Sequence, residues 1–437
     1  MNKYYHIATY GCQMNVHDSE KIAGILEQKG YKASKIEDAD IIVFNTCCIR
    51  ETAEKKIFGN IGDIKRLKKQ NPSIIVAVVG CMSQQQGMQE LLKKRFPFID
   101  IIMGTTNYHK ISQAIDHVLL IKHYYGSVVY EEKPEIIEDV PIYRTSGVNA
   151  WVNIMYGCNN FCAYCIVPYV RGRERSREPQ KVLDEIKSLL DKDYKEITLL
   201  GQNVNSYCND MDNGWSFARL LENIAKIKGK FRLRFMTSHP KDFNKEIVDI
   251  IASSPNICNH IHLPVQSGSN RILKLMNRKY TREHYLEIID HIKTIPGVGI
   301  TSDIMVGFPT ETDQDFEDTL SLVKQVRYSN AFTFVYSPRK GTPAAEMEQI
   351  PASIKKQRIT KLVALQNKIT REISQEYIGL TKEVLVEDIN PKFENTLCGR
   401  TESGRLVNFE GNKSLIGQFV DIKILKAKSA SLWGERQ

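Results

Sequence analysis

The sequence predicts an α/β fold in three parts: a parallel α/β domain, a partial (β/α)6 barrel of the TIM type and a small antiparallel β-barrel. Short β-rich runs alternate with amphipathic helical stretches over residues 1–121, and the alternation resumes with a longer period over residues 144–374. Residues 375–437 contain short β-like runs separated by glycines, as a small barrel requires. We expect residues 122–143 to link the first two parts.

Length and composition fit an enzyme of several domains rather than a fibrous, disordered or membrane protein. The chain has 437 residues, 42% of them hydrophobic and 25% charged. No apolar run nears the ~18 residues of a membrane span. The N-terminus lacks the apolar core and cleavage site of a signal peptide, which predicts a cytoplasmic protein with reduced thiols. The net charge of +9 suggests a polyanionic partner, although solvated lysines explain it equally well.

Three strand–loop–helix units make up the first part. We predict strands at Tyr4–Tyr10, Ile41–Asn45 and Ile74–Val79, followed by helices at Asp18–Gln28, Glu51–Lys69 and near Gln85–Lys94. A parallel sheet collects the loops after its strands along one edge, so Cys12, Cys47 or Cys48, and Cys81 should converge. A free cysteine is often only a small buried hydrophobe, but these follow β-runs beside Gly, Thr or Asn. That position favours ligands of an iron–sulfur cluster with one open iron.

Six β-like runs predict the barrel: Ala150–Met155, Lys195–Leu200, Phe231–Met236, His260–Leu263, Ile300–Val306 and Ala331–Tyr336. In such folds the active site lies in the loops that follow the strands. These loops hold a cysteine triplet and polar segments at residues 201–205, 237–240, 264–268, 307–309 and 337–340. A basic helix at Ser353–Glu376 should lead to the third part, where we predict strands at Glu383–Glu387, Arg405–Phe409 and Phe419–Leu425.

The triplet Cys158, Cys162 and Cys165 is the most informative feature of the chain. A four-iron cluster needs one thiolate for each iron, so three cysteines leave one iron free for a substrate or cofactor. A zinc site would need a fourth Cys or His nearby, which residues 153–170 lack, and a disulfide framework would need an oxidising compartment. The spacing C-x3-C-x2-C resembles the signature of the radical S-adenosylmethionine (SAM) enzymes. In those enzymes the free iron binds SAM and passes one electron to its sulfonium.

Further motifs resemble the methylthiotransferases, a family within the radical SAM superfamily. They are Gly11-Cys-Gln-Met-Asn15, Asp18-Ser-Glu20, Asn45-Thr-Cys-Cys-Ile-Arg-Glu51, Gly80-Cys81, Arg171-Gly-Arg-Glu-Arg-Ser-Arg177, Gly201-Gln-Asn-Val-Asn205, Thr237-Ser-His-Pro240, His262-Leu-Pro-Val-Gln-Ser-Gly268 and Val407-Asn-Phe-Glu-Gly411. The resemblance covers nearly the whole chain. It implies a methylthiotransferase domain, a radical SAM barrel and a C-terminal TRAM domain that helps to hold RNA.

The resemblance also implies two [4Fe-4S] clusters. The ligands of the SAM-binding cluster would be Cys158, Cys162 and Cys165, and those of an auxiliary cluster would be Cys12, Cys47 and Cys81. Where the family commonly has Asn-Thr-Cys-Ser, this chain has Cys48 in the last position. We predict Cys47 as the ligand because it occupies the motif position.

The implied reaction converts N6-isopentenyladenosine in tRNA, at the adenosine 3′ of the anticodon, to its 2-methylthio derivative. Because an unactivated aromatic carbon offers no acidic proton, acid–base catalysis does not suffice and a radical is needed. One SAM would donate its methyl group to sulfur on the auxiliary cluster, and a second would give the 5′-deoxyadenosyl radical. The implied partners are tRNA and an electron donor such as flavodoxin or ferredoxin, and we expect a monomer.

SAM itself should lie against the face of the barrel formed by the carboxyl ends of its strands. The candidate contacts are Tyr164, Gly201, Gln202, Asn203, Ser238 and, more weakly, Asp303. Glycine allows close backbone approach, the polar side chains suit the polar groups of SAM, and the tyrosine resembles the aromatic residue that flanks adenine in the superfamily. Each polar candidate serves equally well as a strand-end cap or a hydrogen-bonded loop residue.

Arginine recurs at every second position directly after the triplet. In an extended segment the four guanidinium groups would share one face, which suits RNA phosphates. These candidate RNA contacts are Arg171, Arg173, Arg175 and Arg177. Without the resemblance, internal pairing with the neighbouring glutamates explains them equally well.

The third part carries as many acidic as basic residues, so it is not a general basic patch. An RNA role there depends on the TRAM resemblance and on the placement of Arg400, Lys426 and Lys428. A plain structural cap is the alternative.

Rival functions come from other substrates or from another class of protein. Sister methylthiotransferases act on threonylcarbamoyl adenosine in tRNA or on a ribosomal-protein aspartate, but the loops at residues 11–15 and 48–51 look unlike theirs. Those loops favour the prenylated adenosine. An iron–sulfur protein that only binds RNA or carries electrons would explain the cysteines and the charge, but not two open clusters.

Overall fold

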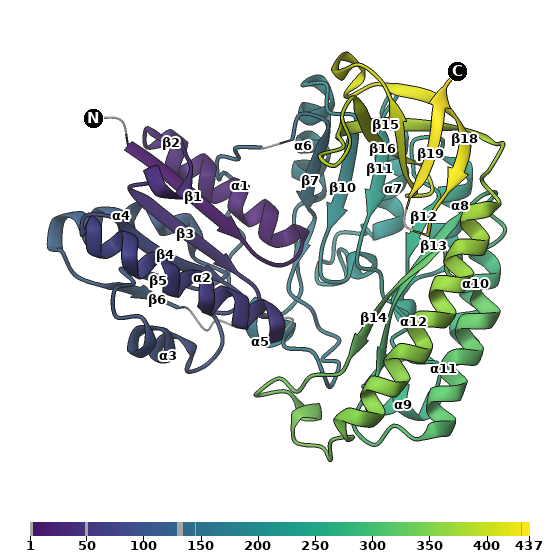
Figure 1. The fold of residues 1–437 in the computed structure, drawn as a ribbon, viewed down its shortest axis with the longest axis horizontal. Coiled ribbons are helices and arrows are strands. Elements are labelled where there is room, and N and C mark those ends of the chain that lie inside the picture. The colour runs from purple at the N-terminus through teal and green to yellow at the C-terminus, as the bar shows by residue number, and fades with distance from the viewer. Residues whose placement is uncertain (1–2, 49–50, 129–133, 145, 430) are drawn as a thin grey trace. The chain divides into compact units, whose positions relative to one another are not determined.

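The computed structural model describes residues 3–48, 51–128, 134–144, 146–429 and 431–437 (Figure 1). The chain divides into two compact units. The first unit comprises Met1–Thr145, Tyr156–Asn159 and Ile166–Arg175, and the second comprises Ser146–Met155, Asn160–Cys165 and Ser176–Gln437.

The first unit is built on a parallel sheet of six strands in the order β2-β1-β3-β4-β5-β6. The strands are β1 (Lys3–Thr9), β2 (Tyr31–Ala33), β3 (Ile41–Thr46), β4 (Ile75–Gly80), β5 (Ile101–Met103) and β6 (Tyr125–Ser127). The helices are α1 (Gln13–Gln28), α2 (Glu51–Gln70), α3 (Met88–Arg95), α4 (Ile111–Ile121) and α5 (Val167–Arg171). The predicted parallel α/β domain is confirmed.

Both faces of this sheet are covered by helices, which explains why its central strands are apolar throughout. Ile42 and Phe44 of β3 pack in one core cluster with residues of α2 and α3. Ile41 and Val43 pack on the other face with residues of α1 and α4. All six residues of β3 and of β4 are buried, as is usual for parallel strands between two helical layers.

The segment 122–143, which the sequence predicted to be a linker, contributes to the first unit. Strand β6 lies in it and pairs with β5 at the edge of the sheet. Val140 packs against one core cluster, and a Cβ atom at Gly24 of α1 would lie only 2.2 Å from the carbonyl oxygen of Pro141. The predicted boundary at residue 121 is therefore too early, because the sheet continues beyond it.

The second unit contains the predicted six-stranded barrel. Its strands are β7 (Asn149–Asn153), β10 (Glu196–Leu200), β11 (Arg232–Phe235), β12 (His260–His262), β13 (Gly299–Val306) and β14 (Asn330–Val335). They form two three-stranded parallel sheets, β11-β10-β7 and β12-β13-β14, and a parallel bridge between Leu233 and Ile257 adjoins the first of them. The helices are α6 (Pro179–Asp191), α7 (Phe217–Ala225), α8 (Lys245–Ser253), α9 (Asn270–Leu275), α10 (Arg282–Ile292) and α11 (Asp313–Val326). Two short strands, β8 (Met155–Tyr156) and β9 (Arg175–Ser176), pair with each other.

Helix α12 (Ala352–Gln375) leads to a closed five-stranded barrel in the order β15-β16-β17-β19-β18. Its strands are β15 (Thr381–Ile389), β16 (Thr396–Thr401), β17 (Leu406–Glu410), β18 (Phe419–Ala427) and β19 (Leu432–Arg436). The small barrel is confirmed, but the sequence analysis missed β16 and β19. The barrel is also not wholly antiparallel, because β17 and β19 run parallel.

The turn between β16 and β17 covers the amino ends of the larger barrel's strands. Arg234 of β11 donates to the carbonyl oxygens of Thr401 at 2.7 Å and of Glu402 at 2.9 Å. Its Nε also pairs with Glu196 at the start of β10, at 2.7 Å. In Figure 1 the small barrel, in yellow, lies at the end where β7, β10 and β11 begin. Within this unit, the loops at the carboxyl ends of the strands are therefore on the other side from the small barrel.

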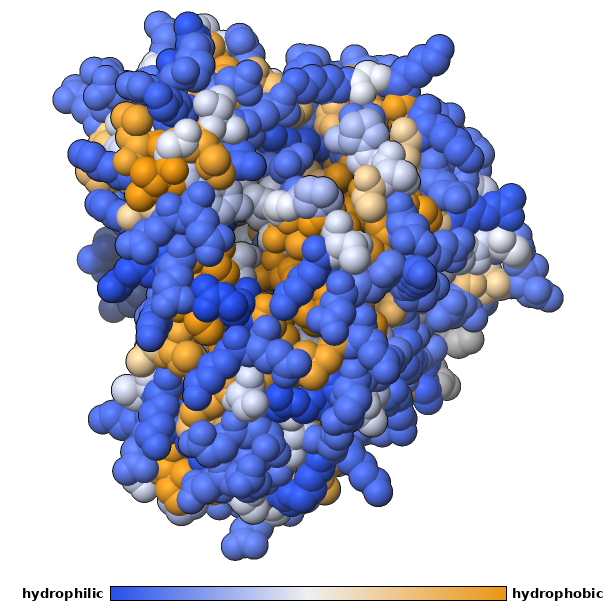
Figure 2. All heavy atoms as spheres, turned by 90° about the vertical axis from the view of Figure 1, so that its right-hand side faces the viewer, coloured by the Kyte–Doolittle hydropathy of each residue, from blue (hydrophilic) through white to orange (hydrophobic). Residues whose placement is uncertain are grey.

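The surface carries mostly charged and polar side chains on the face drawn in Figure 2, with hydrophobic groups in smaller patches between them. Among the helices of the described residues, none combines the length and the apolar character that crossing a membrane requires.

Candidate active site

Three cysteines of the first unit follow three neighbouring strands of its sheet. Cys12 comes after β1, Cys47 after β3 and Cys81 after β4, and β3 pairs with both β1 and β4. Cys47 and Cys81 are buried, whereas Cys12 is partly exposed. Cys12 is also the N-cap of α1, where the helix dipole favours a thiolate. The structure brings these loops together as the sheet topology predicts.

Two glycines allow the cysteine loops to approach one another. At Gly11, whose φ is +118°, a Cβ atom would lie 2.6 Å from Cβ and 2.9 Å from Sγ of Cys47. At Gly80, whose φ is +100°, a Cβ atom would lie 2.6 Å from the carbonyl oxygen of Thr46. A side chain at either position would clash with the loop that follows β3, so both positions require glycine.

Asn15, in the first turn of α1, ties two of these loops together. Its Nδ2 donates to the carbonyl oxygen of Thr46 at 2.9 Å, and its own carbonyl accepts from Nδ2 of Asn45 at 2.7 Å. The thiol of Cys12 donates to Oδ1 of Asn15 at 3.5 Å. Buried polar bonds of this kind fix the loops before any ligand binds.

Cys48 is the second thiol in the loop after β3, and it is also buried. It donates a hydrogen bond to the sulfur of Cys81, which raises the pKa of Cys48 well above its ordinary value. The same bond, assisted by Arg171, lowers the pKa of Cys81 to about 6. A lowered pKa favours the thiolate form of Cys81, which suits its predicted role as an iron ligand, with Cys48 as a donor to it. The choice of Cys47 as the ligand stays a prediction.

Arg171 lies among these cysteines in the first unit. Its side chain is 5% exposed, and its Nη2 donates to Oδ2 of Asp18 at 2.8 Å and to Oδ1 of Asn15 at 3.3 Å. Burial raises the pKa of Cys12, and the guanidinium of Arg171 opposes that rise. The prediction that Arg171 contacts RNA phosphates is therefore wrong. Arg171 is the last residue of α5, which Pro168 helps to begin, so it does not belong to the extended chain that the alternation suggested.

The other alternating arginines do not share one face either. Arg177 is buried in the second unit, where its Nη1 lies 2.7 Å from Oε2 of Glu185. In the first unit Arg175 is partly buried and donates to three main-chain carbonyls, including that of Arg171 at 2.8 Å. Arg177 is thus not available to RNA, whereas RNA contacts of Arg173 and Arg175 stay predictions.

The cysteine loop, residues 160–165, carries two thiols of the triplet in the second unit. The N–H of Cys165 donates to the carbonyl of Cys162 at 2.9 Å, which forms a turn. The loop is held by the segment after α9: Met276 accepts a main-chain bond from it at 2.9 Å, and Asn277 donates to two of its carbonyls. Cys158 belongs to the first unit, where its N–H donates to the carbonyl of Gly172 at 3.1 Å.

Arg278 is a residue of this site that the sequence analysis missed. It is 8% exposed, and its Nη1 lies 3.5 Å from Sγ of Cys162. Its Nη2 donates to the carbonyl of Pro264 at 2.8 Å and its Nε to the hydroxyl of Tyr280 at 3.0 Å. Because 116 residues separate Arg278 from Cys162, no local pattern indicates the contact.

Among the described residues, several buried polar atoms without a hydrogen-bond partner lie in the loops after β10 and β11. The N–H of Val204 donates to the carbonyl of Thr237 at 3.2 Å and so joins the two loops. Asn203 and Ser238 are buried, and neither Oδ1 of Asn203 nor Oγ of Ser238 has a hydrogen-bond partner among the described residues. A buried polar atom without a partner costs free energy, which a bound ligand can recover. These two predicted SAM contacts therefore fit the polar groups of SAM.

Asn205 and His239, in the same two loops, also carry buried polar atoms of this kind, and the sequence analysis did not single them out. In the described part of the chain Nδ2 of Asn205 and Nε2 of His239 are buried without a partner. The N–H of His239 donates to Oδ1 of Asn205 at 3.1 Å. Burial lowers the pKa of His239 to about 2, so its ring is neutral at physiological pH.

The remaining SAM candidates differ in their surroundings. A Cβ atom at Gly201 would lie 2.7 Å from Cγ of Met155, so that side of the glycine is filled by Met155. Asp303 lies on β13, and its Oδ1 is 3.8 Å from Nε2 of His262. The last two, Tyr164 in the cysteine loop and Gln202 after β10, are partly exposed. Their contacts with SAM stay predictions.

The small barrel presents basic and aromatic side chains together. Lys428 is exposed and its Nζ lies 5.8 Å from the ring centre of Trp433. Phe393, which is 47% exposed, packs edge-on against the same ring. Lys426 is exposed, and Arg400 is exposed but pairs with Glu387 at 3.4 Å. Such aromatic and cationic clusters are typical of surfaces that bind single-stranded nucleic acid.

No three His, Cys, Asp or Glu side chains in the described ranges lie close enough together to hold a single metal ion. A four-iron cluster places each thiolate on a different iron, so its ligands are spread around a larger group. Three loop thiols at neighbouring strand ends, with a buried guanidinium beside them, fit a group of that size and charge.

The fold and the cysteine sites define a radical SAM protein. The profile of the radical SAM superfamily matches residues 152–323, that of the uncharacterized protein family UPF0004 matches residues 4–104, and that of the TRAM domain matches residues 375–435. Proteins named tRNA-2-methylthio-N(6)-dimethylallyladenosine synthase are similar over nearly the whole chain. The one from Clostridium botulinum (strain Langeland) is 54% identical over 99% of this chain and 96% of its own, and the one from Thermoanaerobacter pseudethanolicus is 50% identical over 99% and 93%. The chain belongs to the family of these synthases.

Solved structures support the fold alone. The radical SAM methyltransferase TsrM from Kitasatospora setae aligns with a TM-score of 0.56 and 13% identity, over 88% of this chain and 77% of that one. The radical SAM enzyme OxsB aligns with a TM-score of 0.53 and 13% identity, over 84% and 56%. The predicted resemblance to methylthiotransferases is confirmed by the sequence relatives. Of its motifs, Ile49 and Arg50 lie outside the described residues.

Proposed function

We propose that this chain methylthiolates tRNA: it converts N6-isopentenyladenosine, at the position 3′ of the anticodon, to its 2-methylthio derivative. The observation that carries the proposal is the 54% identity to synthases named for this product, over nearly the whole length of both chains. The chain also has both cysteine sets on which the reaction depends.

Two [4Fe-4S] clusters and SAM are the cofactors of this proposal. Membership of the radical SAM superfamily implies one cluster and SAM. The second cluster is supported by the thiols after β1, β3 and β4, where the preformed loops and the guanidinium of Arg171 suit an anionic group. When bound, these cofactors supply methyl transfer to sulfur and the radical that attacks the adenine ring, with two SAM molecules used per turnover.

The side chains of the protein then bind and orient. Oδ1 of Asn203 and Oγ of Ser238 would satisfy polar groups of SAM, and Asn205 and His239 offer two further polar atoms in the same loops. His239 contributes as a neutral ring, since burial keeps its pKa near 2. A dry, pre-arranged set of this kind holds SAM in one orientation at little entropic cost.

The proposal includes tRNA as the macromolecular partner. Phe393, Trp433 and Lys428 of the small barrel suit unpaired bases and phosphates of an anticodon loop. We further propose a low-potential electron donor such as flavodoxin or ferredoxin, a monomeric protein and a cytoplasmic location, where thiols stay reduced.

Mass analysis of tRNA nucleosides from a strain that lacks this gene tests the function. We expect the prenylated adenosine to accumulate without its methylthio group, and a plasmid copy to restore the modification. A plasmid copy with Cys162→Ala should not restore it. Unchanged methylthio-prenyladenosine in the deletion strain, with loss of a modified threonylcarbamoyl adenosine or ribosomal aspartate instead, would assign the chain to a sister substrate.

A further inference from the structure

Among the described residues, Arg278 differs from the other buried arginines of the second unit because it makes no ion pair with a carboxylate. Arg234 pairs with Glu196 at 2.7 Å, and Arg358 pairs with Glu311 at 2.7 Å. Among the described residues, Arg278 contacts only a carbonyl, the hydroxyl and ring of Tyr280, and the sulfur of Cys162. In the described structure its partners at hydrogen-bond distance therefore include no carboxylate, and they do include a cysteine of the triplet.

A guanidinium is always charged, and a buried charge is costly unless an opposite charge lies beside it. Arg278 is 8% exposed, so water screens it little. No carboxylate of the described residues pairs with it, whereas a negatively charged cluster bound through Cys162 would compensate its charge. The geometry therefore suits a negatively charged group held at Cys162.

We infer that Arg278 is a positioning residue for the radical SAM cluster, and that its charge makes this cluster easier to reduce. This inference rests on the proposed function, because it needs a four-iron cluster on the triplet. Three thiolates give such a cluster a net negative charge, and adding one electron increases that charge. A guanidinium 3.5 Å from one ligand sulfur stabilises the reduced form more than the oxidised form.

The conformation of the cysteine loop is held mainly by contacts other than those of Arg278. The carbonyl of Met276 accepts from a main-chain N–H of the cysteine loop, and the side-chain Nδ2 of Asn277 donates to two of its carbonyls, so these bonds do not involve the guanidinium. Removing the charge of Arg278 therefore leaves these bonds to the cysteine loop in place. The interaction between Arg278 and the cluster can be tested by substitution without removing a ligand.

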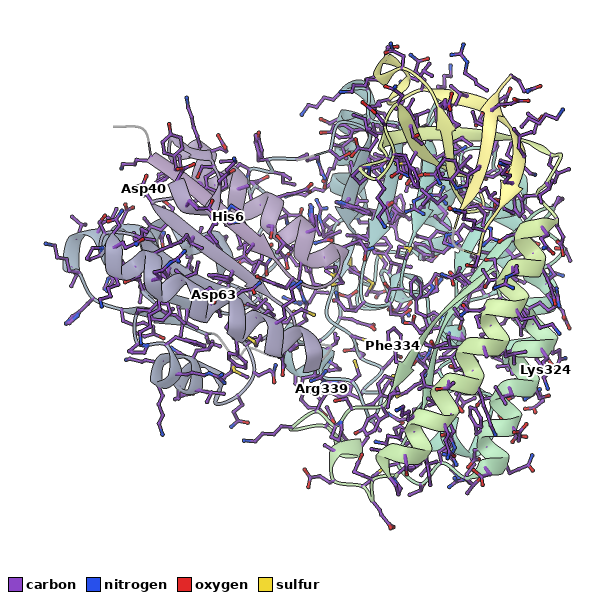
Figure 3. The ribbon with its side chains drawn as sticks, in the orientation of Figure 1. His6, Asp40, Asp63, Lys324, Phe334 and Arg339 are labelled. Carbon is purple, nitrogen blue, oxygen red and sulfur yellow. The ribbon has the colours of Figure 1, made fainter. Side chains whose placement is uncertain are left out.

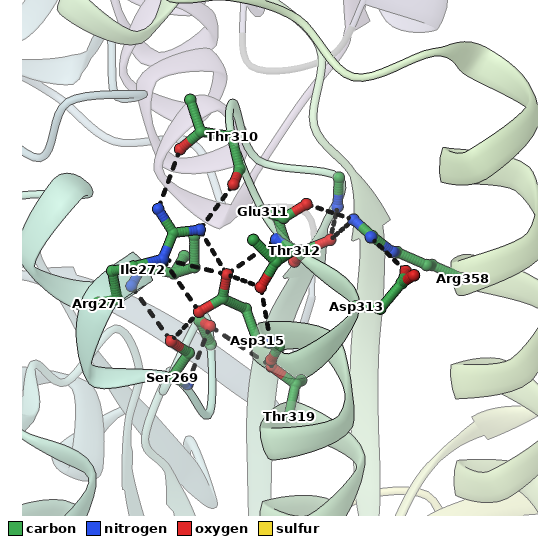
Figure 4. A network of polar contacts seen from close by, with 12 residues as sticks. Ser269, Arg271, Ile272, Thr310, Glu311, Thr312, Asp313, Asp315, Thr319 and Arg358 are labelled. Atoms are coloured by element: carbon green, nitrogen blue, oxygen red, sulfur yellow. Dashed lines mark hydrogen bonds and ion pairs between the residues drawn. The ribbon is translucent and has the colours of Figure 1, made fainter.

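A matched control lies seven residues earlier on the same segment. Arg271 of α9 is half-exposed and pairs with Asp315, and no cysteine is among its hydrogen-bond or ion-pair partners in the described structure (Figure 4). The substitution Arg271→Gln removes the same charge from the same region. It leaves Asp315 with Ser269 and Thr312 as hydrogen-bond donors.

The experiment measures the reduction potential of the triplet cluster by anaerobic redox titration with electron paramagnetic resonance. All proteins carry Cys12→Ala, Cys47→Ala and Cys81→Ala, so that only the triplet binds iron. We compare this parent with added Arg278→Gln, Arg278→Lys and Arg271→Gln. At a fixed potential the ratio of reduced to oxidised cluster should fall about tenfold in Arg278→Gln, which equals a shift of about 59 mV for one electron. It should change much less in Arg278→Lys and not at all in Arg271→Gln.

Each outcome decides the inference. Equal potentials in the parent and in an iron-loaded Arg278→Gln protein would overturn it. If Arg278→Gln binds no iron but Arg278→Lys does, the charge is needed to hold the cluster, which supports it. If neither variant binds iron, Arg278 acts through its shape and the inference fails. A parent that binds no iron on the triplet would instead refute the proposed function.

Discussion

The two cysteine sites of this chain each hold a buried arginine, but only one of these arginines is neutralised by a carboxylate. In the first unit Arg171 pairs with Asp18 at 2.8 Å, beside Cys81 and Cys12. In the second unit Arg278 touches Cys162 and makes no ion pair among the described residues. The charge of the first guanidinium is thus shared between a carboxylate and the cysteines beside it, whereas the second faces its cysteine with no carboxylate partner among the described residues.

This difference between the two arginines corresponds to the roles proposed for the two clusters. A cluster that only holds sulfur for methylation gains from rigid, electrically balanced surroundings. A cluster that must accept an electron gains from a positive charge that stabilises its reduced form. We therefore expect the two sites to respond differently to removal of their arginines, and the following variants are ordered from the largest expected effect to the smallest.

Removal of a ligand should have the largest effect at either site. Cys162→Ala and Cys47→Ala should each abolish methylthiolation, and iron should fall from about eight to about four atoms per chain. Cys162→Ala should also abolish formation of 5′-deoxyadenosine, while Cys47→Ala leaves it intact. Anaerobic reconstitution with iron counting and coproduct analysis measures both.

Cys48→Ala is the control for the first site. It removes the donor to Cys81 but no predicted ligand, so iron content should stay near eight atoms per chain. Loss of four irons in Cys48→Ala, with full iron in Cys47→Ala, would reverse the ligand assignment.

Removal of Arg171 should mainly destabilise the first unit. Arg171→Met leaves the buried carboxylate of Asp18 without its partner, which costs about 3–5 kcal/mol of stability. The double variant Arg171→Met, Asp18→Leu should recover much of that loss. Because the chain has several domains, hydrogen exchange of the β1, β3 and β4 amides measures the effect better than a single unfolding midpoint. Equal protection in the parent and Arg171→Met would show that the pair is not a structural element.

The sequence predicted much of the first site but not its arginine. Cys12, Cys47 and Cys81 could be placed together because strand order in a parallel sheet fixes which loops meet. Arg171 could not, because it ends the short helix α5 and its partner Asp18 lies 153 residues away in the sequence, so no local pattern indicates the contact. Strand β6 was missed for a similar reason: three residues without strong alternation gain their place only by pairing with β5.

In the second site the sequence predicted the ligands and the loops but not their partners. Asn203 and Ser238 stand in motifs directly after strands, so their position indicated a ligand site. Arg278 sits between Asn277 and Lys279 in a polar turn, where a charged side chain ordinarily faces solvent. Its burial depends on Cys162 and Pro264, which come from other elements, and such long-range contacts leave no local signal.

Loss of a polar contact to SAM should have an intermediate effect. Ser238→Ala and Asn203→Ala should each weaken SAM binding about tenfold, since one hydrogen bond in a buried site contributes about 1–1.5 kcal/mol. Equilibrium dialysis with the iron-loaded protein measures the affinity. Ser206→Ala is a control in the same loops, because its hydroxyl already donates to the carbonyl of Asn203 at 2.9 Å. Equal affinity in Ser238→Ala and the parent would remove Ser238 from the SAM site.

The smallest effect is expected at the small barrel, which within the second unit lies on the other side from the loops at the carboxyl ends of the larger barrel's strands. Lys428→Glu should weaken tRNA binding several-fold. In a plot of the logarithm of the binding constant against the logarithm of the salt concentration, the slope should become less steep by about 0.7–0.9, the value for the loss of one phosphate contact. Lys324→Glu, on α11 (Figure 3), removes an equally exposed charge and should leave the salt slope unchanged. Because the total charge changes equally in both variants, a difference between them reports a local contact of Lys428 and not a general loss of positive charge. Equal slopes in the two variants would show that Lys428 makes no local contact with tRNA. The small barrel would then have a structural role, in which it covers the amino ends of the larger barrel's strands through the bonds of Arg234 to Thr401 and Glu402.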